Sequence, residues 1–397
     1  MKKPVIGMVF HGEYPTHPRI ENQALHLISE GMEIHLFCVT YNQMDTLEEN
    51  YKGIHIHRYY LPRWMYKLSA LAYTIPFYHW LMQSHLKSFI ASSQADILHV
   101  HNMNLAQAVF HLNKKYNLPI VLDLHENVPE IMKFYPHLQS GLGKLLIKPS
   151  QWKKKEEDFI RKSDRVIVVT NDAKEEIESR VGIASDKILV LPNFTNDSFK
   201  KPTYDKTLAE RFTDKFNVLY IGDTGVRRGL ESVIKAIPKL TDNVPNLNLI
   251  IVGSSSNDNE LIKLIKNEGV ENYVSLEGWQ SENILPDYVH LCDVGICPLL
   301  RNLHHDTTYA NKLFQYAMLG KPILASDSTA QKNLIESESW GLIHQANDSA
   351  DFAKQLKKLY ADTELRTRLG LNGEKSIQEK YNYNSSDFGK TFYNTLC

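Results

Sequence analysis

The sequence predicts an α/β protein with two domains, each built around a parallel β-sheet, and three observations carry this prediction. Short apolar runs alternate with amphipathic helical stretches, which is the order of β-α-β units. The same order begins again at residue 216, after a charged stretch at 199–214 that lacks strong periodicity. A length of 397 residues, 43% of them hydrophobic and 23% charged, suits two globular domains. We therefore expect a first domain over 1–200, a second over 201–381, and a linker at 199–214.

Composition limits the classes of partner and compartment. The formal net charge of −1 at pH 7 gives no overall attraction to nucleic acid, and no nucleic-acid-binding motif is present. Four scattered cysteines without metal-site spacing are typical of reduced thiols in a cytoplasm. The basic start leads into only a short apolar run before a polar loop, which indicates a first strand and not a signal peptide. We expect a cytoplasmic protein that binds no nucleic acid.

The first half of the chain is predicted to form a parallel sheet with a ligand site at the carboxyl ends of its strands. Strands are expected at 5–10, 34–39, 95–101, 119–124, 164–170 and 188–193. A polar loop at 11–19 follows the first of them. Its residues His11, Gly12 and Arg19 are candidate ligand contacts, and a plain connecting loop is the alternative interpretation.

A second polar group follows the buried strand at 119–124. It begins with His125 and Glu126, at the place where α/β proteins carry their chemistry. An imidazole can hydrogen-bond a hydroxyl or move a proton near neutral pH, and a neighbouring carboxylate can orient it. The chain contains 17 histidines, so most of them are structural, and His99 and His101 are weaker candidates than His125.

The second half repeats the pattern, with strands expected at 216–222, 247–253, 274–276, 293–299 and 340–344 and helices at 350–371 and 381–396. Gly222 ends the first of these strands, and Arg228 lies at the start of the next helix. Arginine there can grip a phosphate with two parallel hydrogen bonds, whereas a solvated surface charge is the alternative. Gly278 and Trp279 end the strand at 274–276, and Trp279 can equally be a core residue.

The stretch at 306–326 combines a polar loop, a helix that Gly320 ends, and a buried strand. Asn311, Lys312 and Gln315 lie around the first turn of this helix. Helix amide groups, the positive end of the helix dipole and a lysine together form a phosphate site. An ordinary amphipathic helix with a solvated lysine is the alternative.

This helix carries a family resemblance. The matching residues are Asn311, Lys312, Leu313, Phe314, Tyr316, Gly320, Lys321 and Pro322. On these residues the chain resembles the retaining glycosyltransferases of family 4, in the subgroup whose signature reads Asn-Lys-Leu-Phe-Glu-Tyr. The resemblance implies the GT-B fold, in which two Rossmann-like β/α/β domains face a central cleft, and a last helix at 382–397 that returns to the first domain.

The resemblance also assigns the donor sugar and ribose contacts. In the family's fuller motif, two glutamates eight residues apart hold these groups, and here Thr307 and Gln315 stand at those places, with Asp306 one residue away. Asn311 lies between them. The amide of Gln315 can hydrogen-bond a ribose diol, although without the strength of a charged acceptor.

The remaining site residues follow from the same resemblance. Gly222, Arg228 and Lys312 are implied to bind the donor diphosphate, and Gly278 and Trp279 to lie near the nucleotide base. His125, with Glu126, is implied to lie beside the reacting centre. His11, Gly12 and Arg19 are implied to lie on the acceptor side.

The function implied is transfer of a sugar from a nucleotide-diphosphate donor to a saccharide or lipid-linked saccharide, with retention, in cell-surface polysaccharide or glycolipid synthesis. Cations would neutralise the departing diphosphate, so neither a metal nor a further cofactor is expected. Two alternatives stay open. A nucleotide-sugar epimerase would share the phosphate cations and the histidine, and a non-catalytic nucleotide-sugar binder would explain the missing glutamates.

One further region stands out by composition. Residues 51–95 contain no Asp or Glu, and lysine and arginine alternate there with tyrosine and tryptophan. Such a mixture suits a lipid-water interface, although the apolar runs are too short to span a bilayer. We expect a peripheral contact with an anionic membrane on its cytoplasmic face, and a pair of core helices that happen to lack acids is the alternative.

Overall fold

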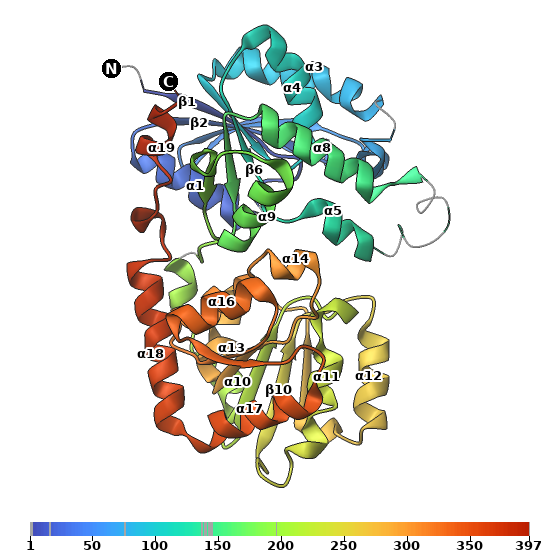
Figure 1. Ribbon diagram of the computed structural model, residues 1–397, viewed down its shortest axis with the longest axis vertical. Helices are drawn as coiled ribbons and strands as arrows, with labels where there is room; N and C mark the ends of the chain where they lie inside the picture. Colours follow the sequence, from blue (N-terminus) through green and yellow to red (C-terminus); the bar gives the residue numbers. More distant parts are fainter. Residues whose placement is uncertain are drawn as a thin grey trace. The chain divides into compact units, whose positions relative to one another are not determined.

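A computed structural model describes residues 3–15, 17–74, 77–135, 138, 141, 146–195 and 197–396 of the chain. The chain forms two compact units (Figure 1). Unit 1 comprises Met1–Pro192 with Ser386–Cys397, and unit 2 comprises Asn193–Ser385. The division after Pro192 precedes the expected boundary at 200, and the return to unit 1 at Ser386 follows the expected one at 381.

Unit 1 contains an eight-stranded sheet in the order β3-β4-β2-β1-β5-β6-β7-β8. The strands are β1 (Val5–Val9), β2 (Glu33–Thr40), β3 (Glu48–Tyr51), β4 (Ile54–Tyr60), β5 (Ile97–His101), β6 (Ile120–Asp123), β7 (Arg165–Val168) and β8 (Ile188–Val190). Every neighbouring pair is parallel except the edge pair β3–β4. The chain order reverses direction between β1 and β5, and such switch points are where open α/β sheets bind ligands.

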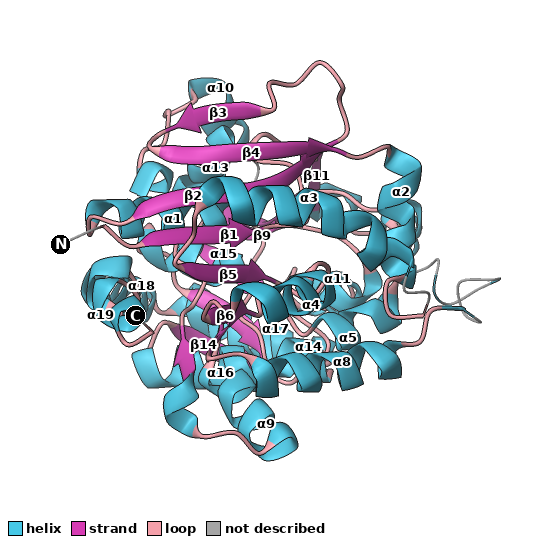
Figure 2. Cartoon of the chain, turned by 90° about the horizontal axis from the view of Figure 1, so that it is seen from above, coloured by secondary structure: helices cyan, strands magenta, loops and turns pink. Residues whose placement is uncertain are grey.

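Among the described residues, the helices of unit 1 are α1 (Pro18–Ser29), α2 (Arg63–Leu68), α3 (Phe77–Ser93), α4 (Ala106–Tyr116), α5 (Val128–Ile131), α8 (Pro149–Lys162), α9 (Asn171–Val181) and α19 (Lys390–Asn394) (Figure 2). Phe89 of α3, Val109 of α4 and Phe159 of α8 join the core of one sheet face. Helix α1 packs against β2. Buried apolar side chains on these helices therefore fix the strands whose ends carry the polar groups.

Two parts of unit 1 differ from the prediction. Residues 51–95 contain a strand, β4, that the sequence analysis did not expect, because histidines occupy its outward positions in place of the usual small polar residues. The expected helix at 381–396 is instead a short 3₁₀ turn at Tyr383–Ser385 in unit 2 and the short α19 in unit 1. Tyr393 of α19 is fully buried, and the carbonyl of Phe388 contacts His26 Nε2 at 2.9 Å.

Unit 2 contains a six-stranded parallel sheet in the order β11-β10-β9-β12-β13-β14. The strands are β9 (Phe216–Ile221), β10 (Leu247–Val252), β11 (Val274–Gly278), β12 (Val294–Cys297), β13 (Ile323–Ser326) and β14 (Gly341–His344). Counted from β9, this is the 3-2-1-4-5-6 order of doubly wound nucleotide-binding sheets. The switch point lies between β9 and β12, so the carboxyl ends of these strands are the expected ligand site.

The helices of unit 2 are α10 (Lys206–Phe212), α11 (Leu230–Ile234), α12 (Asp258–Asn267), α13 (Leu285–Leu291), α14 (Leu303–Asp306), α15 (Asn311–Met318), α16 (Thr329–Glu338), α17 (Ser349–Ala361) and α18 (Thr363–Glu379). The expected helix at 350–371 is two helices, because Asp362 ends α17 and caps α18 by accepting a hydrogen bond from the Leu365 amide. None of the helices in the described ranges is both long and apolar enough to span a bilayer.

The predicted linker at 199–214 is wrong. Phe199, Leu208 and Phe212 of this stretch are buried in the core of unit 2 with Tyr288. Leu208 and Phe212 lie four residues apart on α10, so they face the core while the charged residues between them face solvent. The short amphipathic helix α10 was not predicted because most residues around its two buried positions are charged or polar.

Candidate functional site

Lys312 is the central residue of the polar group in unit 2. It lies in the first turn of α15, is only 6% exposed, and its Nζ lies 3.4 Å from the centroid of the Tyr220 ring. This ammonium makes no hydrogen bond within the described part of the chain. Burial lowers the pKa of Lys312 from 10.5 to about 7. A buried cation without a partner is costly, and an anion is the partner that would remove that cost.

Gly222 lies beside this ammonium at the end of β9. A Cβ built on Gly222 would lie 3.4 Å from Lys312 Nζ, and the backbone φ of +126° is a value that suits glycine. Gly253, at the end of β10, is closer still to its neighbour, because a Cβ there would lie 2.0 Å from the Gly222 carbonyl oxygen. The bare backbone at both strand ends leaves room next to Lys312.

Two arginines follow Gly222 in the turn before α11. Arg228 Nε lies 3.3 Å from Asp223 Oδ2, and Arg227 Nη2 lies 3.4 Å from the same oxygen. These are long contacts, and the terminal nitrogens of Arg228 donate to no other described residue. Gly229 lets the turn approach β12, since a Cβ there would lie 1.8 Å from the Pro298 carbonyl oxygen. The turn therefore holds two guanidinium groups at the switch point of the sheet.

His305 fixes the position of Arg227. Its Nδ1 lies 2.7 Å from the Leu300 carbonyl oxygen and its Nε2 lies 3.2 Å from Arg227 Nη1. These partners require a neutral ring that donates to the carbonyl and accepts from the guanidinium. Burial lowers the pKa of His305 to about 4, which agrees with a neutral ring at physiological pH. His305 is a site residue that was not among the candidates expected from the sequence.

The loop before α15 holds Asp306 and Thr307 in contacts of its own. Asp306 Oδ1 accepts a hydrogen bond from the Thr329 amide at 2.8 Å and lies 3.3 Å from Arg301 Nε. The Thr307 hydroxyl donates to the Leu303 carbonyl at 2.7 Å. Both residues thus stabilise the loop that leads into the lysine helix.

Asn311 and Gln315, the other two residues expected near the sugar and ribose, lie on α15 with Lys312. Asn311 is exposed, and its Oδ1 accepts a hydrogen bond from Asn193 at 3.2 Å. Gln315 is partly buried, and its amide makes no hydrogen bond to a described residue. Gln315 therefore keeps its full hydrogen-bonding capacity for a ligand.

Gly278 and Trp279 end the edge strand β11. Trp279 is 76% exposed, which removes the interpretation that it is a core residue. The neighbouring Glu277 is held by Arg211 at 2.6 Å and by the Tyr288 hydroxyl at 2.7 Å. A rigid strand end therefore presents a large aromatic ring to solvent.

Asp123 is the centre of a buried polar group in unit 1. Its two carboxylate oxygens accept from Arg19, at 2.8 Å for Nη2 and 3.2 Å for Nε, and Oδ2 also accepts from Gln23 at 2.8 Å. Burial alone would raise the pKa of Asp123, but the Arg19 guanidinium and nearby imidazoles hold it well below its usual range. Arg19 also donates to the Leu191 carbonyl at 2.8 Å.

These contacts correct the interpretation of Arg19. It was expected on the acceptor side, but it is 5% exposed and its guanidinium joins the start of α1 to the ends of β6 and β8. The sequence could not show this ion pair, because Arg19 and Asp123 are 104 residues apart. Arg19 therefore stabilises unit 1.

His125 lies directly above Asp123 at the end of β6. Its Nε2 lies 3.4 Å from Asp123 Oδ2 and 3.0 Å from His101 Nδ1, while its backbone amide donates to Asn102 Oδ1 at 3.2 Å. Burial lowers the pKa of His125, so its ring is neutral at pH 7. The structure thus brings together two histidines that the sequence analysis weighed separately. His101 and Asp123 are register partners on β5 and β6.

The loop after β1 places His11 and Gly12 in unit 1. His11 Nε2 contacts the Tyr78 hydroxyl, and its ring stacks on Tyr66 at 5.7 Å between centroids. The Gly12 carbonyl accepts from the Val39 amide at 3.1 Å, next to the end of β2. Glu126, the neighbour of His125, is exposed. The structure therefore divides the predicted residues between two units, with His11, Gly12, Arg19, His125 and Glu126 in unit 1 and the others in unit 2.

Comparison with known proteins identifies the family. The model for Glycosyl transferases group 1 matches residues 205–376, and the model for Glycosyltransferase Family 4 matches residues 19–199. The two models together account for most of both units. The chain belongs to the glycosyltransferases that these two models describe.

Relatives of this glycosyltransferase are distant in sequence. Alpha-D-kanosaminyltransferase from Streptomyces kanamyceticus is 22% identical over 298 residues, which is 73% of this chain and 74% of that protein. The capsular polysaccharide biosynthesis glycosyltransferase CapM from Staphylococcus aureus is 22% identical over 224 residues, or 54% of each chain. Both support transfer of a sugar as the class of activity.

Solved structures confirm the predicted GT-B fold. Sucrose-phosphate synthase from Thermosynechococcus elongatus has a TM-score of 0.77 at 17% identity, over 96% of each chain. HepE from Anabaena, solved in complex with UDP and glucose, has a TM-score of 0.73 at 14% identity, over 99% of each chain. The glycosyltransferase therefore has two Rossmann-like domains.

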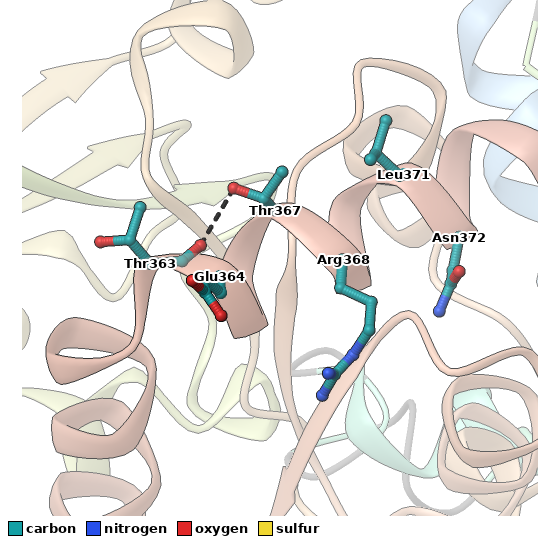
Figure 3. Close-up of a pocket in the computed structure, with 6 residues that line it drawn as sticks. All are labelled: Thr363, Glu364, Thr367, Arg368, Leu371 and Asn372. Atoms are coloured by element: carbon teal, nitrogen blue, oxygen red, sulfur yellow. Dashed lines mark hydrogen bonds between the residues drawn. The ribbon is translucent and has the colours of Figure 1, made fainter.

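A surface hollow lies on α18 of unit 2. It is lined by Thr363, Glu364, Thr367, Arg368, Leu371 and Asn372 (Figure 3). All of these belong to one helix, and the Thr367 hydroxyl donates to the Thr363 carbonyl at 3.0 Å. The lining residues include no strand end, and the one cation among them, Arg368, is exposed to solvent. We therefore assign the hollow no part in the chemistry of the glycosyltransferase.

Proposed function

We propose that this glycosyltransferase transfers a sugar from a nucleotide-diphosphate donor to an acceptor hydroxyl with retention at the anomeric carbon. The observation that carries the proposal is the buried ammonium of Lys312, which has no hydrogen-bond partner in the described chain and lies beside Gly222 at the switch point of unit 2. A diphosphate would supply the missing acceptors. Doubly wound sheets of this order bind nucleotides at that point.

The same residues support a role in bond cleavage. Negative charge develops on the diphosphate as the bond to the sugar breaks, and fixed cations at that place stabilise it. Lys312 and Arg228 are such cations, and His305 holds Arg227 beside them. We therefore propose that no metal ion or further cofactor is needed. Gln315 would hydrogen-bond the ribose or sugar, and the exposed ring of Trp279 would stack on the nucleotide base.

His125 is the proposed residue at the reacting sugar. Its ring is held by His101 and lies 3.4 Å from the Asp123 carboxylate, which is itself fixed by Arg19. A neutral imidazole held this way can donate to or accept from a sugar hydroxyl. Asp123 and His101 would act by positioning that ring.

The acceptor we propose is a saccharide or lipid-linked saccharide used in cell-surface polysaccharide or glycolipid synthesis. CapM supports this choice by its name, and HepE makes UDP the first nucleotide to test. The enzyme would work at the cytoplasmic face of the membrane.

We propose that exposed aromatic and basic residues within 51–95 contact the membrane. Arg58 and Lys52 are paired with Glu49 and Glu21 at 2.7 and 2.5 Å, so residues 51–95 do not form the acid-free surface that the sequence suggested. What remains is a set of exposed aromatic residues, with Trp64 on α2 61% exposed and Trp80 on α3 66% exposed. The exposed cations Arg63 and Lys87 lie on the same two helices.

The test is a product assay with labelled nucleotide sugars and saccharide acceptors, run in the presence of a chelator. Transfer to the acceptor, with the anomeric configuration of the donor preserved in the product by NMR, is the expected result. A changed donor sugar without transfer would show an epimerase. Tight binding of the nucleotide sugar without any conversion would show a binding protein.

A further inference from the structure

A second cluster of titratable side chains lies on the β2–β4–β3 edge of the sheet in unit 1. Its members are Glu33 and His35 on β2, His55 and His57 on β4, and Glu48 on β3. His35 is the register partner of His55, and His57 is the register partner of Glu48. Side chains two residues apart on a strand share a face. Register therefore places all five side chains on one face of the sheet.

Three of these residues present ligand atoms at metal-binding separation. One atom each from Glu33, His35 and His55 lies within 4.8 Å of the other two. His35 Nε2 already lies 3.0 Å from Glu33 Oε1. Ligands around tetrahedral zinc lie roughly 3.4 Å apart, since the metal bonds are about 2.0–2.1 Å long. Small rotations of partly exposed side chains are enough to complete such a site.

The other two residues support the ligand His35 from behind. His35 Nδ1 lies 2.9 Å from His57 Nε2, and His57 Nδ1 lies 3.7 Å from Glu48 Oε1. The Nε2 nitrogen of His35 donates its proton to the Glu33 carboxylate, and a metal ion would take the place of that proton. The ring would then keep its proton on Nδ1 and donate it to His57 Nε2. Metal-binding histidines are generally oriented in this way by a hydrogen bond from the second ring nitrogen.

The cluster is both anchored and accessible. His57 packs edge-on against Phe89 of α3, at 5.4 Å between ring centroids, which fixes the supporting end. The rings of His35 and His55 stack at 4.8 Å. The side chain of Glu33 is 44% exposed and that of His35 is 13% exposed, so an ion can enter from solvent at the Glu33 side.

A second group in unit 1 has comparable ligand spacing but a different charge environment. His99, His101 and Asp123 are also close enough to share an ion. However, the Arg19 guanidinium holds both oxygens of Asp123, and a cation there would be placed against another cation. No arginine or lysine makes an ion pair with Glu33 or Glu48 among the described residues. The edge cluster is therefore the better site for a cation.

We propose that Glu33, His35 and His55 bind one divalent transition-metal ion of the zinc class, with a water molecule completing the coordination. Two imidazoles and a carboxylate suit zinc, cobalt or nickel and do not suit magnesium or calcium. The ion joins β2 to β4 and so stabilises the edge of the sheet. It lies outside the residues proposed for sugar transfer, and the proposal is independent of them.

Calorimetric titration of metal-free, tag-free protein with Zn²⁺ and Co²⁺ tests the site. We expect wild type to bind one equivalent more than the His35→Ala and His55→Ala variants. The His57→Phe variant, which removes only the support, is expected to bind roughly 10–100-fold more weakly than wild type. Zn²⁺ is expected to raise the Tm of wild type.

The matched control is His111→Ala, which removes an exposed histidine on α4 and should leave the stoichiometry unchanged. Glu33→Gln is a mild variant at a half-exposed position that keeps the fold and should also weaken binding. Equal affinity and stoichiometry in wild type, Glu33→Gln and His35→Ala would overturn the proposal, as would the absence of Zn²⁺ and Co²⁺ binding by wild type.

Discussion

The ammonium of Lys312 lies 3.4 Å from the centre of the Tyr220 ring, at the end of the first strand of unit 2. An aromatic face attracts a cation, but this contact recovers only part of the free energy that burial of the charge costs. The protein therefore holds a destabilising charge at the switch point of a nucleotide-binding type of sheet. An anionic ligand at this place would offset the cost of burying the charge.

The first prediction concerns the stability of Lys312→Met. We expect this variant to unfold at higher denaturant concentration than wild type at neutral pH, because methionine fills the same space without a charge and its sulfur can contact Tyr220. Lys354→Met, at an exposed position on α17, is the control and should change stability little. A Lys312→Met variant less stable than wild type would show that the ammonium is well accommodated.

The gain in stability should depend on pH. Burial lowers the pKa of Lys312 to about 7 in the folded protein from an ordinary 10.5, so between these values the unfolded chain binds more protons. The stability of wild type therefore rises over this window relative to Lys312→Met. The advantage of the variant should be full below about pH 7 and should shrink toward pH 10.5. An advantage that stays constant with pH would mean that Lys312 does not titrate in this range.

The second prediction concerns Gln315. If its free amide contacts the donor, Gln315→Ala should weaken nucleotide-sugar binding by about 1 kcal/mol, and Gln315→Glu should preserve or strengthen it. Thermal shift with a nucleotide sugar measures both. A silent alanine variant together with a harmful glutamate variant would place Gln315 outside the site.

The general course of the fold could be predicted from the sequence because parallel strands are buried on both faces and appear as apolar runs. Gly222, Arg228 and Lys312 could be grouped because the chain resembles a known family at these positions. The Arg19–Asp123 ion pair and the His101–His125 contact could not be predicted. The first joins α1 to β6, and the second depends on the pairing of β5 with β6, so both need contacts between segments that are apart in the chain.

Local composition differs from the three-dimensional environment in two places. Residues 199–214 resembled a linker because charged residues surround Leu208 and Phe212. Residues 51–95 contain no acid, but Glu21 and Glu49 from elsewhere in unit 1 form ion pairs with Lys52 and Arg58. The charge around a residue depends on its neighbours in the folded protein. A short stretch of sequence does not include those neighbours.

The third prediction concerns His125. Its proposed role is in the transition state, so His125→Ala should lower turnover by roughly 10²-fold or more while nucleotide affinity changes little. His111→Ala controls for loss of an imidazole elsewhere in unit 1. Turnover equal to that of wild type in His125→Ala would remove this histidine from the mechanism.

The fourth prediction concerns membrane contact. Flotation with anionic vesicles should recover wild type, and added salt should reduce recovery, because each cation near the surface contributes about 1 kcal/mol. Combined Arg63→Glu and Lys87→Glu substitutions, or Trp64→Ala with Trp80→Ala, should lower recovery. Lys354→Glu is the control for a charge change on unit 2. Equal recovery on neutral and anionic vesicles would contradict an electrostatic contact.

Binding of a nucleotide diphosphate by Lys312 and Arg228 is tested by calorimetric titration with UDP, GDP and ADP in the presence of a chelator. The proteins to compare are wild type, Lys312→Ala, Arg228→Ala and the control Lys354→Ala. We expect at least one nucleotide to bind wild type and the control alike. Each site variant should lose about 1.5–3 kcal/mol of binding free energy, the range for hydrogen bonds to charged groups. Nucleotide binding of equal strength in wild type, Lys312→Ala and Arg228→Ala would show that these two cations do not bind the diphosphate.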